Sequence, residues 1–317
     1  MLQKEILFKI KETSEKLEIR ETTILSFLDL ISSKKNYTSK DLIRKTALPQ
    51  THLYRLIQEF TDILESNIKY IKVRTDFSKK LSGFIEKAKQ DTLINNLSEI
   101  KKTFKSYQKN KPQPNRDLDQ FYATVNTTFK RVFKMAKNSD LKNKKIAFLG
   151  DDDLTSVATA LSHQAQEITV FEIDDRLNNF IKQISDKNNL NIEIVKQDLR
   201  QPIDKRHFNK YDIIFTDPPY TKDGIELFLN QAIKLMKNSF LSRIYLCYGN
   251  SDRAREREVE IQKLLLNHNL IIKSKINQFN KYYGAESIGS NSSLYLLDWT
   301  PSTKTINSDF KKIYTNE

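Results

Sequence analysis

The sequence has little of what builds several common protein classes. It holds one cysteine, Cys247, in 317 residues, which excludes an internal disulfide and a thiolate metal cluster. With only 6 glycines and 7 prolines, the composition rules out a collagen-like chain and argues against a mainly disordered one. No run approaches about 18 apolar residues, and the N-terminus alternates charged and apolar residues, which excludes a transmembrane helix and a signal peptide. We therefore expect a cytoplasmic protein with no membrane partner.

The positive charge is concentrated in the first part of the chain. The length suggests two domains, and the formal net charge is +13. Residues 1–140 hold 28 Lys plus Arg against 17 Asp plus Glu, whereas residues 141–317 hold 25 against 23. A basic domain is typical of proteins that bind nucleic acid. A composition rich in Lys, Asn and Ile raises the charge without any function, and we weigh the two interpretations equally.

The first part is predicted to be a winged helix-turn-helix. Apolar residues at helical spacing predict a helix over Glu21–Ser32, and a short second helix is predicted over Asp41–Ala47, with a cap in Tyr37-Thr38-Ser39 before it. A third helix follows with Thr51 as its cap, and Ile68–Val73 alternates like a strand. With a polar helical connector, this domain is expected over residues 1–110. A DNA-reading role is an alternative that we do not favour, because such modules also serve as scaffolds.

The second part alternates strands with helices. This pattern predicts an α/β domain over residues 111–300, followed by a polar tail over 301–317. Its seven strands, the last two antiparallel, resemble the Rossmann-like fold of adenosylmethionine-dependent transferases. Ligands of such sheets bind beyond the carboxyl ends of the strands. The predicted strands are Lys145–Leu149, Glu167–Ile173, Ile192–Val195, Tyr211–Thr216, Arg243–Tyr248, Ile271–Phe279 and Ser293–Trp299.

Three adjacent acids follow the first of these strands. Gly150 supplies the turn, and Asp151, Asp152 and Asp153 stand where transferases of this fold have a glycine-rich loop that approaches the donor's amino acid end. Adjacent carboxylates repel one another. One aspartate would suffice to cap the following helix, so three indicate a bound cation. A donor without a carboxylate, or a polycationic acceptor, fits this loop.

Acids also follow the second and third strands. Glu172 stands where nucleotide-binding sheets often hold ribose hydroxyls, and Asp174 is the reserve candidate. Asp198 and Leu199 stand where such sheets often hold adenine. An alternative for Asp198 is a surface acid paired with Arg200.

The strongest local motif follows the fourth strand. It reads Asp217-Pro218-Pro219-Tyr220, and a motif of this kind is typical of transferases that alkylate nitrogen. The two prolines fix the backbone and remove two amide donors, so their carbonyls and Asp217 can accept from an amine. Tyr220 offers a ring to a cationic nitrogen.

Together these segments resemble the branched-chain polyamine synthases, the N4-bis(aminopropyl)spermidine synthase family, over about residues 112–285. The matching motifs are Asp117-Leu118-Asp119-Gln120, Gly150 to Ser156, Phe171 to Arg176, Asp198-Leu199-Arg200, Asp217 to Thr221 and Phe279-Asn280-Lys281-Tyr282. The resemblance implies decarboxylated S-adenosylmethionine as a co-substrate, with no tightly bound cofactor. It also implies spermidine as the acceptor, 5'-methylthioadenosine as by-product and a homodimer.

The expected chemistry is attack by a secondary amine on the methylene group beside a sulfonium. The rate of this reaction then depends on how well the amine, the carbon and the sulfur are aligned and on removal of the proton from the amine. Asp217 and the carbonyls of Pro218 and Pro219 would orient the amine. Asp152 or Asp153 would anchor ammonium groups and take the proton, and the sequence does not separate the two. Tyr220 and Tyr282 complete the expected substrate set.

Two rival functions stay open. An adenosylmethionine-dependent N-methyltransferase acting on DNA or RNA would use the motif at Asp217, and a polyamine-sensing DNA-binding regulator would use the basic domain. No metal site is expected, because the four histidines share no ligand spacing, although the acid cluster could hold a divalent cation.

Overall fold

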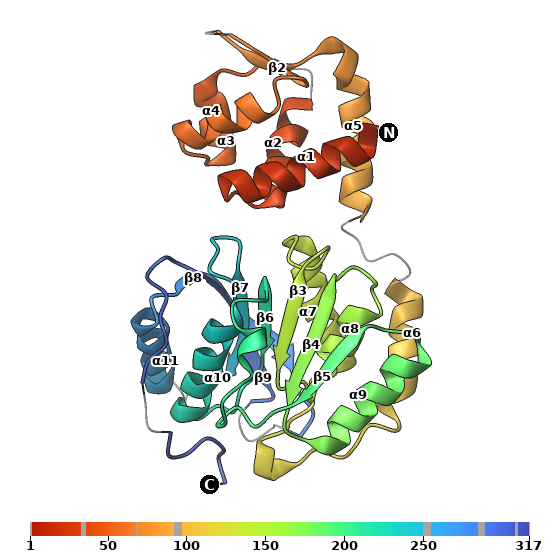
Figure 1. Cartoon of the computed structure of the whole chain (residues 1–317), viewed down its shortest axis with the longest axis vertical. Helices are drawn as coiled ribbons and strands as arrows, with labels where there is room; N and C mark the ends of the chain where they lie inside the picture. The colour runs from red at the N-terminus through yellow and green to blue at the C-terminus, as the bar shows by residue number, and fades with distance from the viewer. Residues whose placement is uncertain are drawn as a thin grey trace. The chain divides into compact units, whose positions relative to one another are not determined.

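The computed structural model describes residues 2–32, 36–67, 69–91, 97–249, 255–284, 289–307 and 310–316. The chain divides into two compact units, Met1–Leu93 and Ile94–Glu317, whose elements are drawn in Figure 1. This division comes earlier than the predicted boundary at residue 110. The reason is α6 (Leu97–Gln108), which packs on the second unit: the buried ring of Phe104 lies edge-on to Phe129, with centroids 5.4 Å apart.

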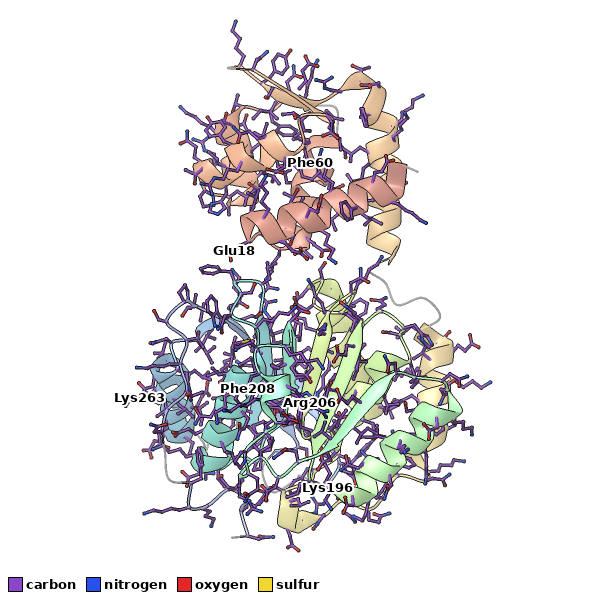
Figure 2. The ribbon with its side chains drawn as sticks, viewed as in Figure 1. Glu18, Phe60, Lys196, Arg206, Phe208 and Lys263 are labelled. Carbon is purple, nitrogen blue, oxygen red and sulfur yellow. The ribbon has the colours of Figure 1, made fainter. Side chains whose placement is uncertain are left out.

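The first unit packs helices around one apolar core. Its elements are α1 (Leu2–Leu17), α2 (Glu21–Ser32), α3 (Ser39–Thr46), α4 (Gln50–Glu59), β1 (Leu64–Ser66), β2 (Ile71–Val73) and α5 (Thr75–Asp91). The two strands pair antiparallel. Phe60, labelled in Figure 2, is fully buried in the core, whereas Glu18 is exposed.

Of the two helix caps predicted in this unit, one is confirmed and the other is wrong. A cap was predicted within Tyr37-Thr38-Ser39, and Thr38 is the residue that caps α3: its hydroxyl accepts the backbone N–H of Asp41 in a capping box. The prediction that Thr51 caps α4 is wrong. The helix begins at Gln50, two residues earlier than a Thr51 cap implies. Pro49 is at the N-cap, because a proline at φ −55° leads the backbone into the first turn without a side-chain bond. Ile68 lies outside the described residues. Assignment to the winged helix-turn-helix class stays a prediction.

The second unit contains the predicted mostly parallel sheet. The strands are β3 (Lys145–Leu149), β4 (Glu167–Glu172), β5 (Ile192–Lys196), β6 (Ile213–Thr216), β7 (Arg243–Gly249), β8 (Ile271–Lys281) and β9 (Asn291–Asp298). Their order across the sheet is β5-β4-β3-β6-β7-β9-β8. The first five in this order run parallel, and β9 runs antiparallel to both of its neighbours. The carboxyl ends of β3, β4, β5 and β6 therefore meet at one edge.

Helices cover both faces of this sheet (Figure 1). They are α7 (Val125–Lys137), α8 (Thr155–Ala160), α9 (Asp175–Lys187), α10 (Lys222–Leu235) and α11 (Arg255–Asn267), with short 3-10 turns at Arg116–Leu118 and Lys205–His207. One core lies under α10 and α11, and the other under α6 to α9. This double cover explains why β3, β6 and β7 are largely apolar, whereas the edge strand β5 contains Glu193. Among the described residues, no helix is both long and apolar enough to cross a membrane.

Two segments of the second unit differ from the prediction. Helix α7 was not predicted, although Thr124 caps it and Phe129, Val132 and Met135 bury one face. The tail over 301–317 was expected to be polar. Instead, Ile313 and Tyr314 are buried in the core under α10 and α11.

Candidate active site

The loop after β3 separates the three predicted aspartates into different environments. Gly150 has φ +65°, in the left-handed region that favours glycine, and it turns the chain at the strand end. Asp151 is buried and serves α8: its carboxylate accepts the backbone N–H groups of Thr155 at 2.7 Å and Ser156 at 3.1 Å, and also the Ser156 hydroxyl. Burial raises the pKa of Asp151 to about 7, although these hydrogen bonds oppose the rise. Of the three aspartates, Asp151 is therefore the one that accepts the first backbone N–H groups of α8.

Asp153 points away from the open part of the site. Its carboxylate meets the guanidinium of Arg131 at 2.5 Å and also accepts the backbone N–H of Ala123. Both charged side chains are almost fully buried. Asp153 lines neither of the two clefts described below, so the predicted direct contact with substrate has no support in this geometry.

Asp152 is the aspartate that faces both clefts. Within the described part of the chain its carboxylate makes no hydrogen bond or close ion pair, in contrast to Asp151 and Asp153. Burial raises the pKa of Asp152 well above its usual range, and the neighbouring Asp153 adds to the rise, whereas Lys111 opposes it. An unpaired carboxylate of this kind is ready to receive a cation or a proton.

Asp217 follows β6 and is held on both of its oxygens. Its Oδ2 accepts from Arg131 at 2.7 Å and from the Tyr282 hydroxyl at 2.7 Å, and its Oδ1 accepts from the Tyr220 hydroxyl at 3.1 Å. Burial raises the pKa of Asp217, and Arg131 opposes that rise. Pro218 completes the rigid turn and lines a cleft with these tyrosines. The structure therefore brings together the predicted set of Asp217, Pro218, Tyr220 and Tyr282.

Arg131 is the site residue that the sequence analysis missed. It projects from α7 and is fully buried, and it joins segments that are far apart in the sequence. Besides Asp153 and Asp217, its guanidinium donates to Asn280 at 2.8 Å and to Tyr282 at 3.2 Å. A basic residue on the apolar face of an amphipathic helix was the available signal, because such a residue is buried only when it is paired.

The acids after β4 and β5 have different positions. Both oxygens of Glu172 accept backbone N–H groups, from Asp151 and Asp174, each at 2.9 Å, and Glu172 also lines a cleft. Asp174 caps α9 and pairs with Arg176 at 2.5 Å, and it lines neither cleft. The geometry thus favours the first candidate, Glu172, over the reserve.

Asp198 combines the two interpretations that the sequence left open. It pairs with Arg200 at 2.9 Å and it also lines a cleft beside Leu199. The Leu199 carbonyl accepts from Gln231 of α10 at 2.6 Å, which fixes the backbone at this point. Both predicted adenine-side residues are thus at the cleft wall.

Two adjoining clefts lie at the carboxyl edge of the sheet. The first, of about 570 Å³, is walled by aromatic rings, prolines and acids: Asp119, Phe121, Asp152, Asp217, Pro218, Pro219, Tyr220, Tyr282, Asn291 and Thr315. The second, of about 600 Å³, lies over the ends of β3, β4 and β5, and its wall includes Gly150, Glu172, Asp198, Leu199, Phe228, Ile313 and Tyr314. The walls share Asp119, Asp152, Asp217 and Pro219. Asp152 and Asp217 therefore stand where the contents of the two clefts would meet.

The C-terminal segment helps to close these clefts. The hydroxyl of Thr315 donates to Asp119 at 2.9 Å, and Thr221 donates to the Ile313 carbonyl at 2.6 Å. Tyr314 lies 6.0 Å from the guanidinium carbon of Arg200, measured to the ring centroid. Among the described residues, no three His, Cys, Asp or Glu side chains are arranged to hold a metal ion.

Comparison with known proteins gives a consistent family. Residues 99–316 match the family described as branched-chain polyamine synthase A C-terminal domain. An N(4)-bis(aminopropyl)spermidine synthase of Methanocaldococcus jannaschii is 30% identical over 87% of this chain and 82% of its own length. Another, from Thermococcus kodakarensis, is 38% identical over 60% of this chain and 54% of its own length. For three curated relatives, the matched segment spans only 52% to 57% of the relative's length.

A solved structure supports the fold over the whole chain. It is the branched-chain polyamine synthase of Thermus thermophilus in complex with N4-aminopropylspermidine and 5'-methylthioadenosine. The TM-score is 0.61, with 96% of each chain covered and 18% sequence identity. At this identity the similarity concerns the fold.

Proposed function

This chain belongs to the branched-chain polyamine synthase family, and we propose that it transfers an aminopropyl group from decarboxylated S-adenosylmethionine to the secondary amine of spermidine. The products are 5'-methylthioadenosine and N4-aminopropylspermidine, and a second transfer gives N4-bis(aminopropyl)spermidine. The names of the relatives support this reaction, and so does the pair of ligands in the Thermus thermophilus structure.

The main observation behind this proposal is that two clefts with different linings adjoin each other and share the carboxylates of Asp152 and Asp217. The cleft over β3 to β5 has the glycine turn and the acids expected beside a nucleoside. The cleft with Phe121, Tyr220 and Tyr282 has aromatic rings and carboxylates, which suit a flexible chain of methylenes and ammonium groups. Asp152 and Asp217 belong to both walls.

The shared carboxylates explain the choice of donor. The amino acid end of S-adenosylmethionine carries a carboxylate, which Asp152 would repel in a poorly solvated site. The decarboxylated donor presents only an ammonium there, and the same aspartate attracts it. We therefore assign Gly150, Glu172, Asp198 and Leu199 to the nucleoside part of the donor.

The reaction exchanges one bond for another at a single carbon. The lone pair of the acceptor nitrogen attacks the methylene next to sulfur, the carbon–sulfur bond breaks, and its electron pair stays on sulfur as a neutral thioether. The first transfer leaves a protonated tertiary amine, which then loses its proton. The second transfer leaves a quaternary ammonium with no proton to lose. A general base therefore acts after the first transfer, and both transfers need an unprotonated nitrogen at the start.

The contacts of the two shared aspartates suggest different tasks. Asp217 is fixed by Arg131, Tyr220 and Tyr282, so it orients the attacking nitrogen together with the carbonyls of Pro218 and Pro219. Orientation of this kind contributes a large part of the rate in such displacements. Asp152 has no bonded partner among the described residues and faces both clefts, so it anchors an ammonium group and takes the proton.

Product analysis tests the function and the assignment of Asp152. The purified protein is incubated with either donor, with spermidine or nucleic acid, and the products are identified by mass. We expect aminopropylated spermidine from the decarboxylated donor only. Asp152→Asn should lower kcat by roughly 100-fold or more, whereas Asp186→Asn, an exposed position on α9, should act like the wild type.

Other outcomes of this experiment contradict the proposal. Methylated nucleic acid would support the methyltransferase, and tight DNA binding without any product would support the regulator. Full activity of the Asp152→Asn variant would remove Asp152 from the mechanism.

Three further features stay proposals. We propose a homodimer, a cytoplasmic location and a winged helix-turn-helix within residues 1–110. Light scattering of the purified chain tests the first of these. The family resemblance supports the dimer, and the positions of α2 to α4 and of the β1–β2 pair support the winged helix.

A further inference from the structure

A buried lysine lies beside the acid cluster, in a stretch that the sequence analysis treated as a boundary. The side chain of Lys111 is 9% exposed, and its Nζ lies 3.2 Å from the centroid of the Tyr122 ring. The Tyr122 hydroxyl donates to the Pro112 carbonyl at 2.8 Å. The next residue, Ala123, donates its N–H to Asp153. The stretch from 111 to 123 is therefore fastened to the cluster, with the ammonium of Lys111 held over an aromatic face.

Among the described residues, the carboxylate of Asp152 has neither a hydrogen bond nor a bonded cation, whereas Asp151 and Glu172 accept backbone N–H groups. Arg131 is committed to Asp153 and Asp217, at 2.5 and 2.7 Å. Asp152 makes no close ion pair in the part of the chain that the structure describes. The ammonium of Lys111 is likewise not in ion-pair contact with any described residue, yet its charge interacts with Asp153, Asp152 and Asp151. Lys111 is thus a buried cation whose charge is available to Asp152.

Resting on the proposed function, we propose that Lys111 is a positioning residue for aminopropyl transfer. The positive charge of its ammonium group, held beside the acid cluster, favours the ionised form of the Asp152 carboxylate. In that state Asp152 can attract an ammonium group and take the proton released by the first transfer.

The directions of the titration shifts agree with this geometry. Burial and Asp153 raise the pKa of Asp152, Lys111 lowers it, and Asp217 and Glu172 raise it further. Burial lowers the pKa of Lys111, while the three aspartates oppose that change and Arg131 reinforces it. Removing the charge of Lys111 therefore raises the pKa of Asp152 further, so that a higher pH is needed to ionise this carboxylate.

The test measures kcat and KM for spermidine between about pH 6 and 10. Lys111→Met and Lys111→Gln remove the charge at similar length, and having two such variants guards against a folding defect in one. Lys111→Arg keeps the charge. Lys109→Met is the matched control, because Lys109 is exposed two residues away.

We expect both neutral variants to shift the acidic limb of the kcat profile upward by about one pH unit or more. At neutral pH they should lose roughly tenfold or more in kcat, and activity should recover as the pH rises. Lys111→Arg should keep the limb near its wild-type position, and Lys109→Met should match the wild type.

Three results would overturn the inference. A neutral variant that is less active at every pH, with an unmoved limb, would give Lys111 a structural role only. A lower KM for spermidine with an unmoved limb would mean that Lys111 merely repels the acceptor. A wild-type protein that forms no aminopropylated product would refute the proposed function, and this inference with it.

Discussion

Removal of Arg131 is expected to destabilise the second unit strongly. Arg131→Met deletes a fully buried guanidinium that pairs with Asp153 and Asp217. Methionine fills most of the space, so the main loss is electrostatic. Two buried carboxylates then lack their cation.

The magnitude follows from the burial of the three partners. The side chain of Arg131 is 0% exposed, that of Asp153 is 3% and that of Asp217 is 13%. Breaking a buried pair by removing one partner costs about 3–5 kcal/mol. Since domains are stable by about 5–15 kcal/mol, the variant should lose a third or more of its free energy of unfolding.

The cost should depend on pH with a defined sign. Burial raises the pKa of Asp217 and Arg131 opposes that rise, so without Arg131 the pKa of Asp217 in the folded state lies further above its value in the unfolded state. Such carboxyls carry no penalty below about pH 4, where they are protonated in both states, and the penalty grows as the pH rises. The deficit of the variant should therefore be larger at pH 8 than at pH 5.

Trp299 makes the measurement specific. It is the single tryptophan of the chain and belongs to the second unit, so its fluorescence reports the unfolding of that unit. Denaturant titrations would compare Arg131→Met, Asp217→Asn and the double variant at both pH values. The double variant should lose less than the sum of the single losses, because the two residues share one interaction.

A matched control uses an exposed arginine of the same unit. Arg206 is 64% exposed, and Arg206→Met should change the free energy of unfolding by about 0.5 kcal/mol or less. Should Arg131→Met fall within about 1 kcal/mol of the wild type at pH 8, or should the losses simply add, the ion-pair explanation fails.

Two further predictions concern hydroxyl and carboxyl groups of the site. Tyr282→Phe removes the hydroxyl that donates to Asp217 at 2.7 Å. Because a hydrogen bond to a charged group is worth about 1.5–3 kcal/mol, kcat should fall roughly 10- to 100-fold while the fold stays intact. Steady-state kinetics and circular dichroism check this prediction, and an unchanged kcat would contradict it. The pKa of Asp151 is raised to about 7 in the folded protein, so its ionisation costs stability progressively between about pH 4 and 7. Asp151→Asn should flatten the fall in the free energy of unfolding over that range, as followed by Trp299 fluorescence; a fall as steep as that of the wild type would show that Asp151 does not cause it.

Local sequence patterns were enough to locate most of the polar site residues that follow the strands. Strands covered on both faces are rich in apolar residues, so the parallel strands can be recognised in the sequence and the first polar residues after them are easily found. Gly150, Glu172, Asp198 and Asp217 were all located in this way, and each lines a cleft. Parallel strands bring their carboxyl ends to one edge, so this much needed no knowledge of tertiary contacts.

Only the tertiary structure divided the tasks among the three adjacent aspartates. Their positions in the sequence are equivalent, but Asp151 caps α8, Asp153 is paired with Arg131, and Asp152 faces the clefts. The direction of each side chain depends on the backbone of one tight turn and on partners that other segments supply.

The two buried cations of the site, Arg131 and Lys111, could not be recognised from the sequence for a related reason. Arg131 reaches Asp153 and Asp217 across 22 and 86 positions of the sequence, and Lys111 sits in a proline-punctuated stretch that reads as a linker. A Lys or Arg in a polar or amphipathic segment is normally solvated. Arg131 is buried because folding brings Asp153 and Asp217 from the ends of distant strands to pair with it, and the ammonium of Lys111 lies over the ring of Tyr122. No local sequence pattern contains these contacts.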